Sequence, residues 1–182
     1  MAGLLVPSPT PAVPGGGMTL IQEVVTSAST GVSFTSISGT YKQLLLVWSG
    51  LSTSDNSDFA LRFNNDSGGN YAGTGFGVAD TSLSSFTTST ATSVRVIVTN
   101  TVSPTLGNSG KGYVSIDNYA SASKLKTWSA SINHNSSNKQ LFFLNGIYNS
   151  TSAITSVDIV RTGGSGTFSN ATNTSIRLYG VS

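Results

Sequence analysis

Residues 58–71 read DFALRFNNDSGGNY, and this stretch decides the fold class. In residues 59–63 the aromatic and leucine side chains alternate with other residues, so they share one face of an extended chain while Arg62 points to the other. Residues 64–69 are all of types that favour turns. The stretch therefore predicts a half-buried β-strand that ends in a tight loop.

The same alternation between turn signals recurs along the chain from Met18 onward, and no segment shows the spacing of an amphipathic helix. The predicted strands are Thr19–Thr26, Val32–Ile37, Gln43–Ser49, Asp58–Phe63, Ser93–Thr99, Gly112–Tyr119, Lys124–His134, Lys139–Tyr148, Ile154–Arg161 and Thr174–Val181. About ten strands are more than one flat sheet usually holds before it splits into two layers. We therefore predict an all-β domain over residues 18–182, an antiparallel two-sheet β-sandwich that is jelly-roll-like.

Three segments depart from simple alternation. Residues 81–92 are rich in serine and threonine, which is typical of an exposed loop or a polar edge strand, and we interpret them as a loop. Residues 44–48 and 141–144 are apolar at consecutive positions. Such a run suits a strand that is covered on both sides or one that lies at a subunit interface, and the sequence leaves both alternatives open.

The N-terminal segment, residues 1–17, holds four of the five prolines followed by three glycines. Because proline fixes φ and lacks an N–H donor, this segment cannot join a helix or a central strand. We expect an extended arm, separate from the domain, whose apolar group would anchor it on a partner. The anchor residues are Leu4, Leu5, Val6 and Pro7.

The composition excludes several classes of function. Only 9% of the residues are charged and the net charge is +2, so nucleic-acid binding is not indicated. Without cysteine there is no disulfide, no thiolate nucleophile and no cysteine metal site. The sequence shows neither a signal-peptide pattern nor an 18-residue apolar run, which predicts a soluble protein made in the cytoplasm with no membrane insertion.

Catalytic chemistry finds little support in the sequence. A serine–histidine–acid set would have to use His134, the only histidine, which follows an apolar stripe at the end of its predicted strand. The seven acidic residues are spread through turns and solvated strand positions rather than paired. Oxygen-rich turns such as residues 55–58 resemble calcium ligand sets only in composition. We therefore predict no catalytic residues, no metal and no cofactor.

Binding through the surface is the remaining option. The loop with Asn64, Asn65, Asp66 and Tyr71 combines amides, a carboxylate and an aromatic ring, which together could contact a sugar. Other aromatic residues near polar loops are Trp48, Phe76 and Tyr179, although core packing is the more common role for such residues. This loop is our candidate ligand loop.

Three pieces of the sequence, in this order and spacing, resemble a domain of minor virion proteins of tailed bacteriophages. They are residues 37–44 (ISGTYKQL), residues 61–71 (LRFNNDSGGNY) and a C-terminal segment that joins residues 151–157 (TSAITSV), 166–168 (GTF) and 175–181 (SIRLYGV). The resemblance covers about residues 18 to 182. It implies a β-sandwich of the kind used in tail tips, fibres and head decorations, and it implies no catalytic residues.

From this resemblance we expect a non-enzymatic structural protein of a phage particle, made in the host bacterial cytoplasm and located on the virion surface. The leading hypothesis is a capsid decoration or cement protein that its N-terminal arm anchors to the major capsid protein or a tail protein. The alternative is a tail-tip or fibre protein that binds a host-surface glycan. The consecutive apolar strands indicate a homo-oligomer, most simply a trimer.

Overall fold

A computed structural model describes residues 16–25, 29–51, 54–55, 58–97, 110–135, 139–163, 167–168 and 175–182. The predicted arm therefore lies almost entirely outside the described residues, and so do its anchor residues Leu4, Leu5, Val6 and Pro7. Only Gly16 and Gly17 of the arm are included. The arm stays a prediction.

The described residues form twelve strands in two sheets, and every pair of neighbouring strands is antiparallel. The large sheet contains, in spatial order, β1 (Met18–Val24), β12 (Ser175–Val181), β3 (Gln43–Leu51), β8 (Gly110–Asp117), β9 (Lys126–Asn135), β10 (Lys139–Tyr148), β5 (Tyr71–Ala79) and β6 (Ser82–Ala91). The small sheet contains β2 (Gly31–Phe34), β11 (Val157–Thr162), β4 (Asp58–Phe63) and β7 (Val94–Ile97). The predicted all-β, antiparallel two-sheet sandwich is confirmed. No helix in the described part is long and apolar enough to cross a membrane.

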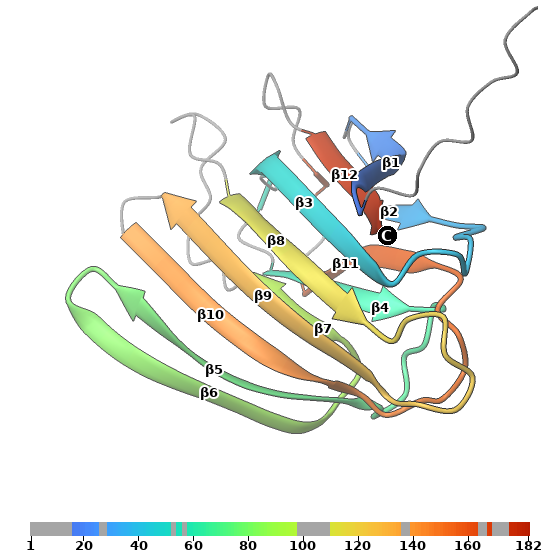
Figure 1. Ribbon diagram of the computed structural model, residues 1–182. Helices are drawn as coiled ribbons and strands as arrows, with labels where there is room; N and C mark the ends of the chain where they lie inside the picture. Colours follow the sequence, from blue (N-terminus) through green and yellow to red (C-terminus); the bar gives the residue numbers. More distant parts are fainter. Residues whose placement is uncertain are drawn as a thin grey trace, which may run out of the picture.

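The two sheets lie one behind the other, with the large sheet in front (Figure 1). Along the chain the two sheets alternate: β1, β3, the hairpin β5–β6, the three strands β8–β10 and β12 belong to the large sheet, and β2, β4, β7 and β11 fall between them in the small sheet. The hairpins β5–β6 and β9–β10 make the large sheet wider than the small one. The order is compatible with a jelly-roll-like arrangement, which stays a prediction.

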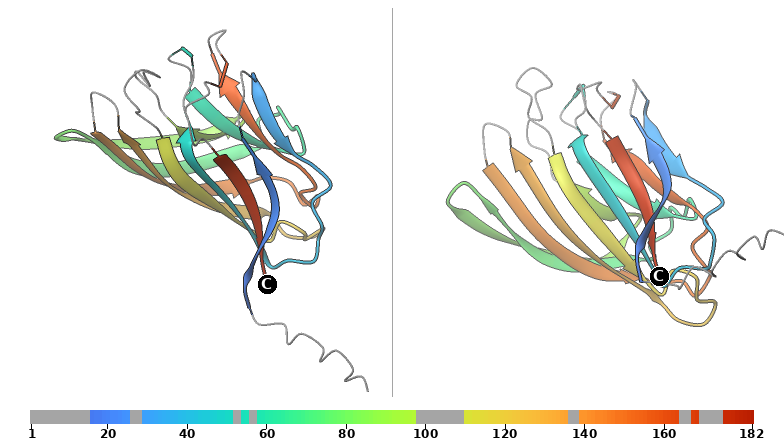
Figure 2. Two further views of the ribbon diagram at one scale, coloured as in Figure 1. Left: turned by 90° about the horizontal axis from the view of Figure 1, so that it is seen from above. Right: turned by 45° about the horizontal axis from the view of Figure 1, so that its top comes forward.

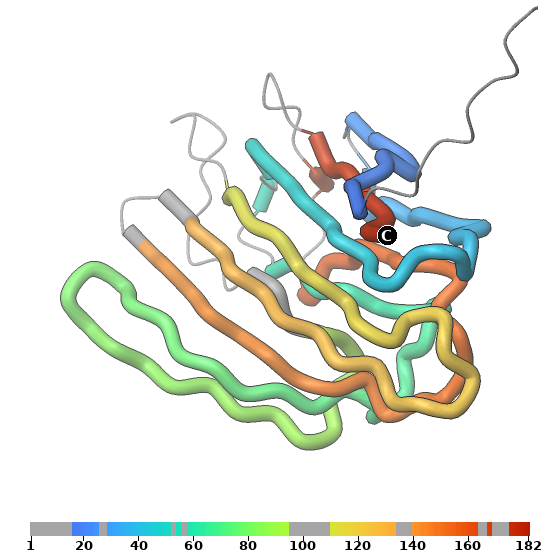
Figure 3. The backbone as a smooth tube through the Cα atoms, viewed as in Figure 1, coloured from blue at the N-terminus to red at the C-terminus, as the bar shows by residue number. Residues whose placement is uncertain are grey.

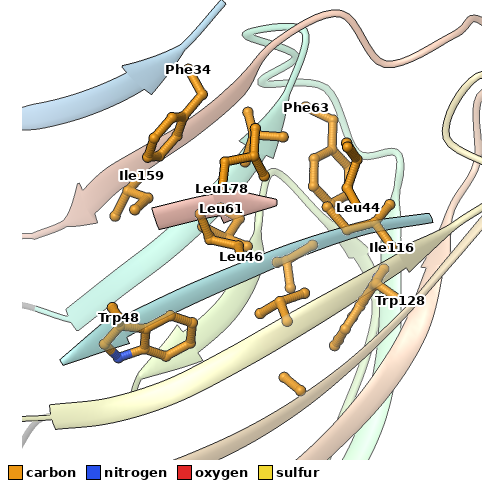
Figure 4. Close-up of a cluster of buried hydrophobic side chains, with 14 of the residues drawn as sticks. Phe34, Leu44, Leu46, Trp48, Leu61, Phe63, Ile116, Trp128, Ile159 and Leu178 are labelled. Atoms are coloured by element: carbon orange, nitrogen blue, oxygen red, sulfur yellow. The ribbon is translucent and has the colours of Figure 1, made fainter. Parts of the chain in front are cut away.

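The hydrophobic core fills the space between the sheets (Figure 4). Leu44, Leu46 and Trp48 point into it from β3, at alternate positions of the first apolar run. Phe63 and Ile159 face them from the small sheet. Because the alternation that the sequence showed in residues 59–63 recurs in β3, one side of each strand supplies the core.

Two strands of the structure are absent from the sequence prediction. β5 was not predicted, and β6 occupies residues 82–91, where a loop was the preferred interpretation, so that interpretation was wrong. Glycines at positions 73, 75 and 77 weaken the strand signal of β5. These glycines nevertheless suit the sheet, because side chains of β9 and β10 lie directly over them: Trp128 over Gly73, Leu144 over Gly75 and Phe142 over Gly77.

The hairpin β5–β6 is the most protruding part of the sandwich. Its turn, Asp80 and Thr81, lies at the far end of the large sheet from the small sheet, as the ribbon and tube views agree (Figure 2 and Figure 3). Of the described strands, only β5 pairs with β6. The hairpin therefore forms one edge of the large sheet, and it has an outer face and an inner face.

Candidate functional site: a polar loop, an apolar sheet face and an inner cavity

The predicted ligand loop begins with a tight turn. The Asp66 N–H donates to the Phe63 carbonyl over 3.0 Å, and the two residues between them, Asn64 and Asn65, have φ values of 55° and 53°. This left-handed pair is the conformation of a type I′ turn, in which asparagine is among the few favoured residues. The asparagines therefore serve the backbone geometry first.

The side chain of Asn64 fastens the turn to the segment that leads into β11. Its amide donates to the Ala153 carbonyl over 2.8 Å, and its Oδ1 accepts from the Thr155 N–H over 2.8 Å and from the Ser156 N–H over 3.2 Å. Asn65 is tied by its backbone N–H, which donates to Asp158 Oδ2 over 3.2 Å. The polar groups of both asparagines thus join two distant parts of the chain.

Asp66 organises the rest of the loop. Its carboxylate accepts from the Gly68 N–H over 2.7 Å, from Asn70 Nδ2 over 2.8 Å and from the Tyr148 hydroxyl over 2.8 Å. The hydrogen bond from Asn70, followed by that from the Gly68 backbone, holds the pKa of Asp66 below its usual value. The carboxylate is a structural acceptor for three donors.

Tyr71 ends the loop inside the protein. Its side chain is 1% exposed, its hydroxyl donates to the Asp66 carbonyl over 3.1 Å, and it accepts from the Phe63 N–H over 3.0 Å. Burial raises the pKa of this phenol. The ring stacks on Tyr148, with centroids 4.9 Å apart. The structure brings the four predicted loop residues together as a cross-link of the fold, and a ligand for the loop stays a prediction.

Acidic residues likewise have structural partners. Asp55 pairs with Arg161 at 2.8 Å, and Asp117 accepts from the Gln43 side chain over 2.7 Å. His134 lies opposite Gln140 in the β9–β10 register, but its side chain is outside the described residues. Within the described ranges, no group of three or more histidine, aspartate or glutamate residues is arranged to hold a metal ion.

The outer face of the widened sheet is apolar. We call the following residues the assembly face: Leu141, Phe143 and Ile147 of β10, Phe76 and Val78 of β5, and Leu83 of β6. Leu83 is 73% exposed, Phe76 is 52% exposed and Phe143 is 42% exposed. The register places Leu141, Val78 and Leu83 side by side across the three strands, and Phe143 beside Phe76.

Five residues of the assembly face adjoin one another, and the exposed Asn145 and Thr74 separate Ile147 from them. The rings of Phe76 and Phe143 are in contact, with centroids 5.5 Å apart. On β9 the adjoining outward positions are Ser129, Ser131 and Asn133, and no described outward-facing side chain of β5, β6 or β9 carries a charge. The six side chains expose on the order of 500 Å² of apolar surface, near the upper end for a monomeric protein. Apolar patches of this size are often functional.

This finding also bears on the two consecutive apolar runs. In β3 the second set of side chains, Leu45 and Val47, is half-buried. In β10 Phe142 faces the core, whereas Leu141 and Phe143 face solvent. The run in β10 therefore fits the alternative of an interface, and Phe76, already considered as a surface aromatic, joins it.

The opposite, inner face of the same hairpin borders a cavity of about 250 Å³. It lies between β5, β6, β9 and β10 of the large sheet and the start of β7 in the small sheet. None of its lining residues is charged: they are Tyr71, Ala72, Gly73, Thr74, Ser85, Phe86, Thr87, Thr88, Ser93, Val94, Trp128, Phe142 and Leu144. No local sequence pattern indicates this cavity, because its walls come from five separated segments.

Trp128 forms part of the cavity wall and lies flat against the sheet. A Cβ atom on Gly73 would come within 2.7 Å of the indole Cζ2, and one on Gly146 would come within 2.5 Å of the same atom. Only glycines at these paired positions leave room for the ring. Trp128 is 4% exposed, and its Nε1 has no hydrogen-bond partner among the described residues. The ring of Trp128 therefore contains a buried donor without a partner among the described residues.

No protein-family model, curated protein or solved structure that was compared with this chain matches it.

Proposed function

We propose that this chain is a non-enzymatic structural protein that binds to the surface of a larger assembly, and that the assembly is a bacteriophage particle. The single observation that supports the assembly role is the assembly face, an exposed apolar surface centred on Phe76 and Phe143. The phage part rests on the resemblance of the three sequence pieces. Together they favour a capsid decoration protein.

An estimate of the interaction energy supports attachment through more than one contact. Burying about 500 Å² of apolar surface is worth about 12 kcal/mol, whereas association costs about 4 to 15 kcal/mol in lost freedom and ordering. The assembly face alone would therefore bind weakly. A second contact, such as the predicted arm with Leu4, Leu5, Val6 and Pro7, would raise the overall affinity by linking two binding events.

Neighbouring copies of this chain on the particle are also expected to bind one another. The free side of β6 continues the edge of the large sheet, and the assembly face reaches that edge at Leu83. Copies placed around a symmetry axis of the particle could share the apolar surface, and a trimer is the simplest ring. The major capsid protein or a tail protein would supply the underlying surface.

The number of copies per particle tests the decoration role. A decoration protein is expected in hundreds of copies, and a tail-tip or fibre protein in a handful to tens. Densitometry of purified particles against the major capsid protein measures the ratio. A low count would contradict decoration and support the alternative, a receptor-binding protein for a host-surface glycan.

Deletion of residues 1–17 tests the anchor. We expect the remaining residues to form the same β-sandwich, because the core lies within residues 32–178, and to lose attachment to particles that lack the protein. Circular dichroism verifies the fold, and co-sedimentation with particles measures attachment. Attachment that persists without the arm would show that the anchor lies elsewhere.

A further inference from the structure

We infer that the outer edge of β6 is a self-pairing site, at which a second copy of this chain adds its own β6 as the next antiparallel strand. Among the described strands only β5 pairs with β6, so the other edge of β6 presents backbone N–H and C=O groups to solvent. The inference deepens the self-association that is part of the proposed function, and it rests on the proposed function to that extent. It does not depend on the bacteriophage particle.

The other three sheet edges in the described part of the chain carry features that natural proteins use against edge-to-edge pairing. β2 and β7 are only four residues long. β1 is interrupted by a register shift between Leu20 and Gln22, and its Glu23 forms an ion pair with Arg177 of β12 at 2.8 Å. Short strands, bulges and charges each oppose the addition of a further strand.

β6 lacks all of these features over most of its length. It is ten residues long and contains no charged residue, no proline and no glycine. Its register with β5 runs without a shift from Ser82 to Thr88. Within this stretch every side chain is exposed except that of Phe86, which is half-buried. A long edge without protection is a template for the addition of another strand.

Charge and symmetry identify the occupant as a second copy. Because β6 is uncharged, two copies of it meet without like-charge repulsion, and β6 offers no charge that would select an acidic or a basic partner strand. Antiparallel pairing of two identical edges follows a two-fold axis perpendicular to the sheet, and two-fold symmetry is the commonest in homo-oligomers. This axis keeps the outer faces of both large sheets on the same side.

The pairing doubles the apolar surface that one particle contact can use. Two assembly faces on the same side of the joined sheets together expose roughly 1,000 Å² of apolar surface, whereas each partner in a standard interface contributes about 800 Å². A single assembly face falls short of that area. The ring of copies proposed above shares the assembly face, so it is a separate contact from the pair at β6.

The length of the regular stretch sets the register of the pair. A two-fold axis at Ser85, the midpoint of residues 82–88, pairs all of these residues, and any other position of the axis pairs fewer of them. Ser85 then lies opposite its own copy, and Leu83 lies opposite Thr87 of the second copy. The Phe76 side chain, 52% exposed and opposite Ser85 on β5, lies beside this axis. Pairing therefore covers part of its ring.

The absence of cysteine from the chain allows a direct test by disulfide cross-linking of single-cysteine variants. Cβ atoms of directly opposite residues are about 4.5 to 5.5 Å apart, close to the separation in a disulfide. We expect full-length Ser85→Cys to form a covalent dimer when it is oxidised with copper phenanthroline. Leu83→Cys and Thr87→Cys should each stay monomeric, because like positions lie about 14 Å apart along the strands, but a mixture of the two should cross-link. Ser33→Cys, exposed on the edge strand β2, is the control and should stay monomeric.

A charge at the axis tests the same contact without cross-linking. Ser85→Lys places two like charges opposite each other and should weaken self-association, measured by sedimentation velocity, at least about tenfold. Ser85→Glu should have the same effect. Because the axis brings position 85 of one copy to position 85 of the other, an equimolar mixture of the two variants should recover the dimer. Ser33→Lys is the matched control and should leave self-association unchanged.

The results separate this inference from the proposed function. A Ser85→Cys protein that stays monomeric, equal cross-linking of Ser33→Cys, or unchanged self-association of Ser85→Lys would each overturn the pairing at β6. Co-sedimentation with particles measures attachment in the same preparations. Attachment without cross-linking through β6 would refute only the pairing, and cross-linking without attachment would refute only the particle role.

Discussion

At the scale of single residues, buried polar groups connect the loops that no strand pairing joins. Lys126 is fully buried at the start of β9, and its ammonium donates to the carbonyls of Ser121, Lys124 and Thr151 over 2.6, 3.0 and 2.7 Å. Burial alone lowers the pKa of this lysine, because the charged form loses hydration. The three carbonyls replace that hydration and hold two loops together.

Replacing Lys126 by methionine should therefore destabilise the protein. Three buried acceptors would lose their donor, and we expect the free energy of unfolding to fall by about 3 kcal/mol. Urea denaturation followed by tryptophan fluorescence measures this change. Lys124→Met, at an exposed neighbouring position, is the control and should change the stability by less than about 0.5 kcal/mol. Equal effects of the two substitutions would contradict a bridging role for Lys126.

Asp66 should make the stability depend on pH. Its pKa is lower in the folded state than its ordinary value of 3.8, so the ionised form stabilises the fold above that value. The contribution is lost as the pH falls through the folded-state pKa. Asp66→Asn should lower the stability at pH 6, and the difference from the natural protein should shrink below about pH 4. Denaturation midpoints across this range provide the measurement, and parallel curves would contradict the assignment.

At the scale of elements, the structure explains which strands the sequence could predict. β4 and β10 have the predicted bounds, because each combines apolar alternation or an apolar run with clear turn residues at its ends. β5 and β6 could not be recognised in the same way. β5 alternates glycine with other residues, and β6 is mostly serine and threonine, so both depend on neighbours that the local sequence does not show.

The residues of the candidate site likewise divide into those that the local sequence could indicate and those that it could not. The apolar run at residues 141–144 left open a strand covered on both sides or an interface, and the structure leaves its outward side chains Leu141 and Phe143 exposed. The partner residues Val78 and Leu83 were not predicted, since they lie on the strands that were missed. Predicting the cavity would require knowing that Gly73 and Gly146 are paired beneath Trp128. This pairing is determined by the strand register.

The contact between Trp128 and the paired glycines can be tested within β10. A side chain at Gly146 would collide with the Ala72 carbonyl and with the indole ring, so Gly146→Val should destabilise the protein by about 2 to 3 kcal/mol. Asn145→Val, on the exposed face of the same strand, should change stability by less than about 0.5 kcal/mol. Thermal unfolding measures both. A neutral effect of Gly146→Val would show that the hairpin can shift to make room.

At the scale of the whole molecule, the two inserted hairpins make the large sheet wider than the small one. The inner sides of both hairpins contribute to the core, through Tyr71 of β5, Trp128 of β9 and Phe142 of β10, whereas the turn end of β5 and β6 extends beyond the small sheet (Figure 1). The outer sides of the same strands carry the apolar side chains of the assembly face. The strands β5 and β10 therefore serve the core with one face and are proposed to bind partners with the other.

The double substitution Phe76→Ser and Phe143→Ser should separate folding from assembly. Both side chains are substantially exposed, so we expect the fold to persist, whereas binding to partners or copies should weaken by about 100-fold. Sedimentation velocity over a range of concentrations measures self-association, and co-sedimentation measures attachment to particles. Tyr113→Ser, at an exposed aromatic on β8, is the control. Unchanged association of the double variant would contradict the role of the assembly face.

The two-residue turn of the β5–β6 hairpin has a practical consequence. Asp80, with a φ of 52°, and Thr81 connect Ala79 to Ser82 at the point farthest from the small sheet. A peptide inserted between them would extend away from the core and would interrupt no strand of either sheet. This turn is therefore the natural position for displaying a foreign epitope or an affinity tag, and in the proposed decoration role many copies on one particle would present it as a dense, regular array.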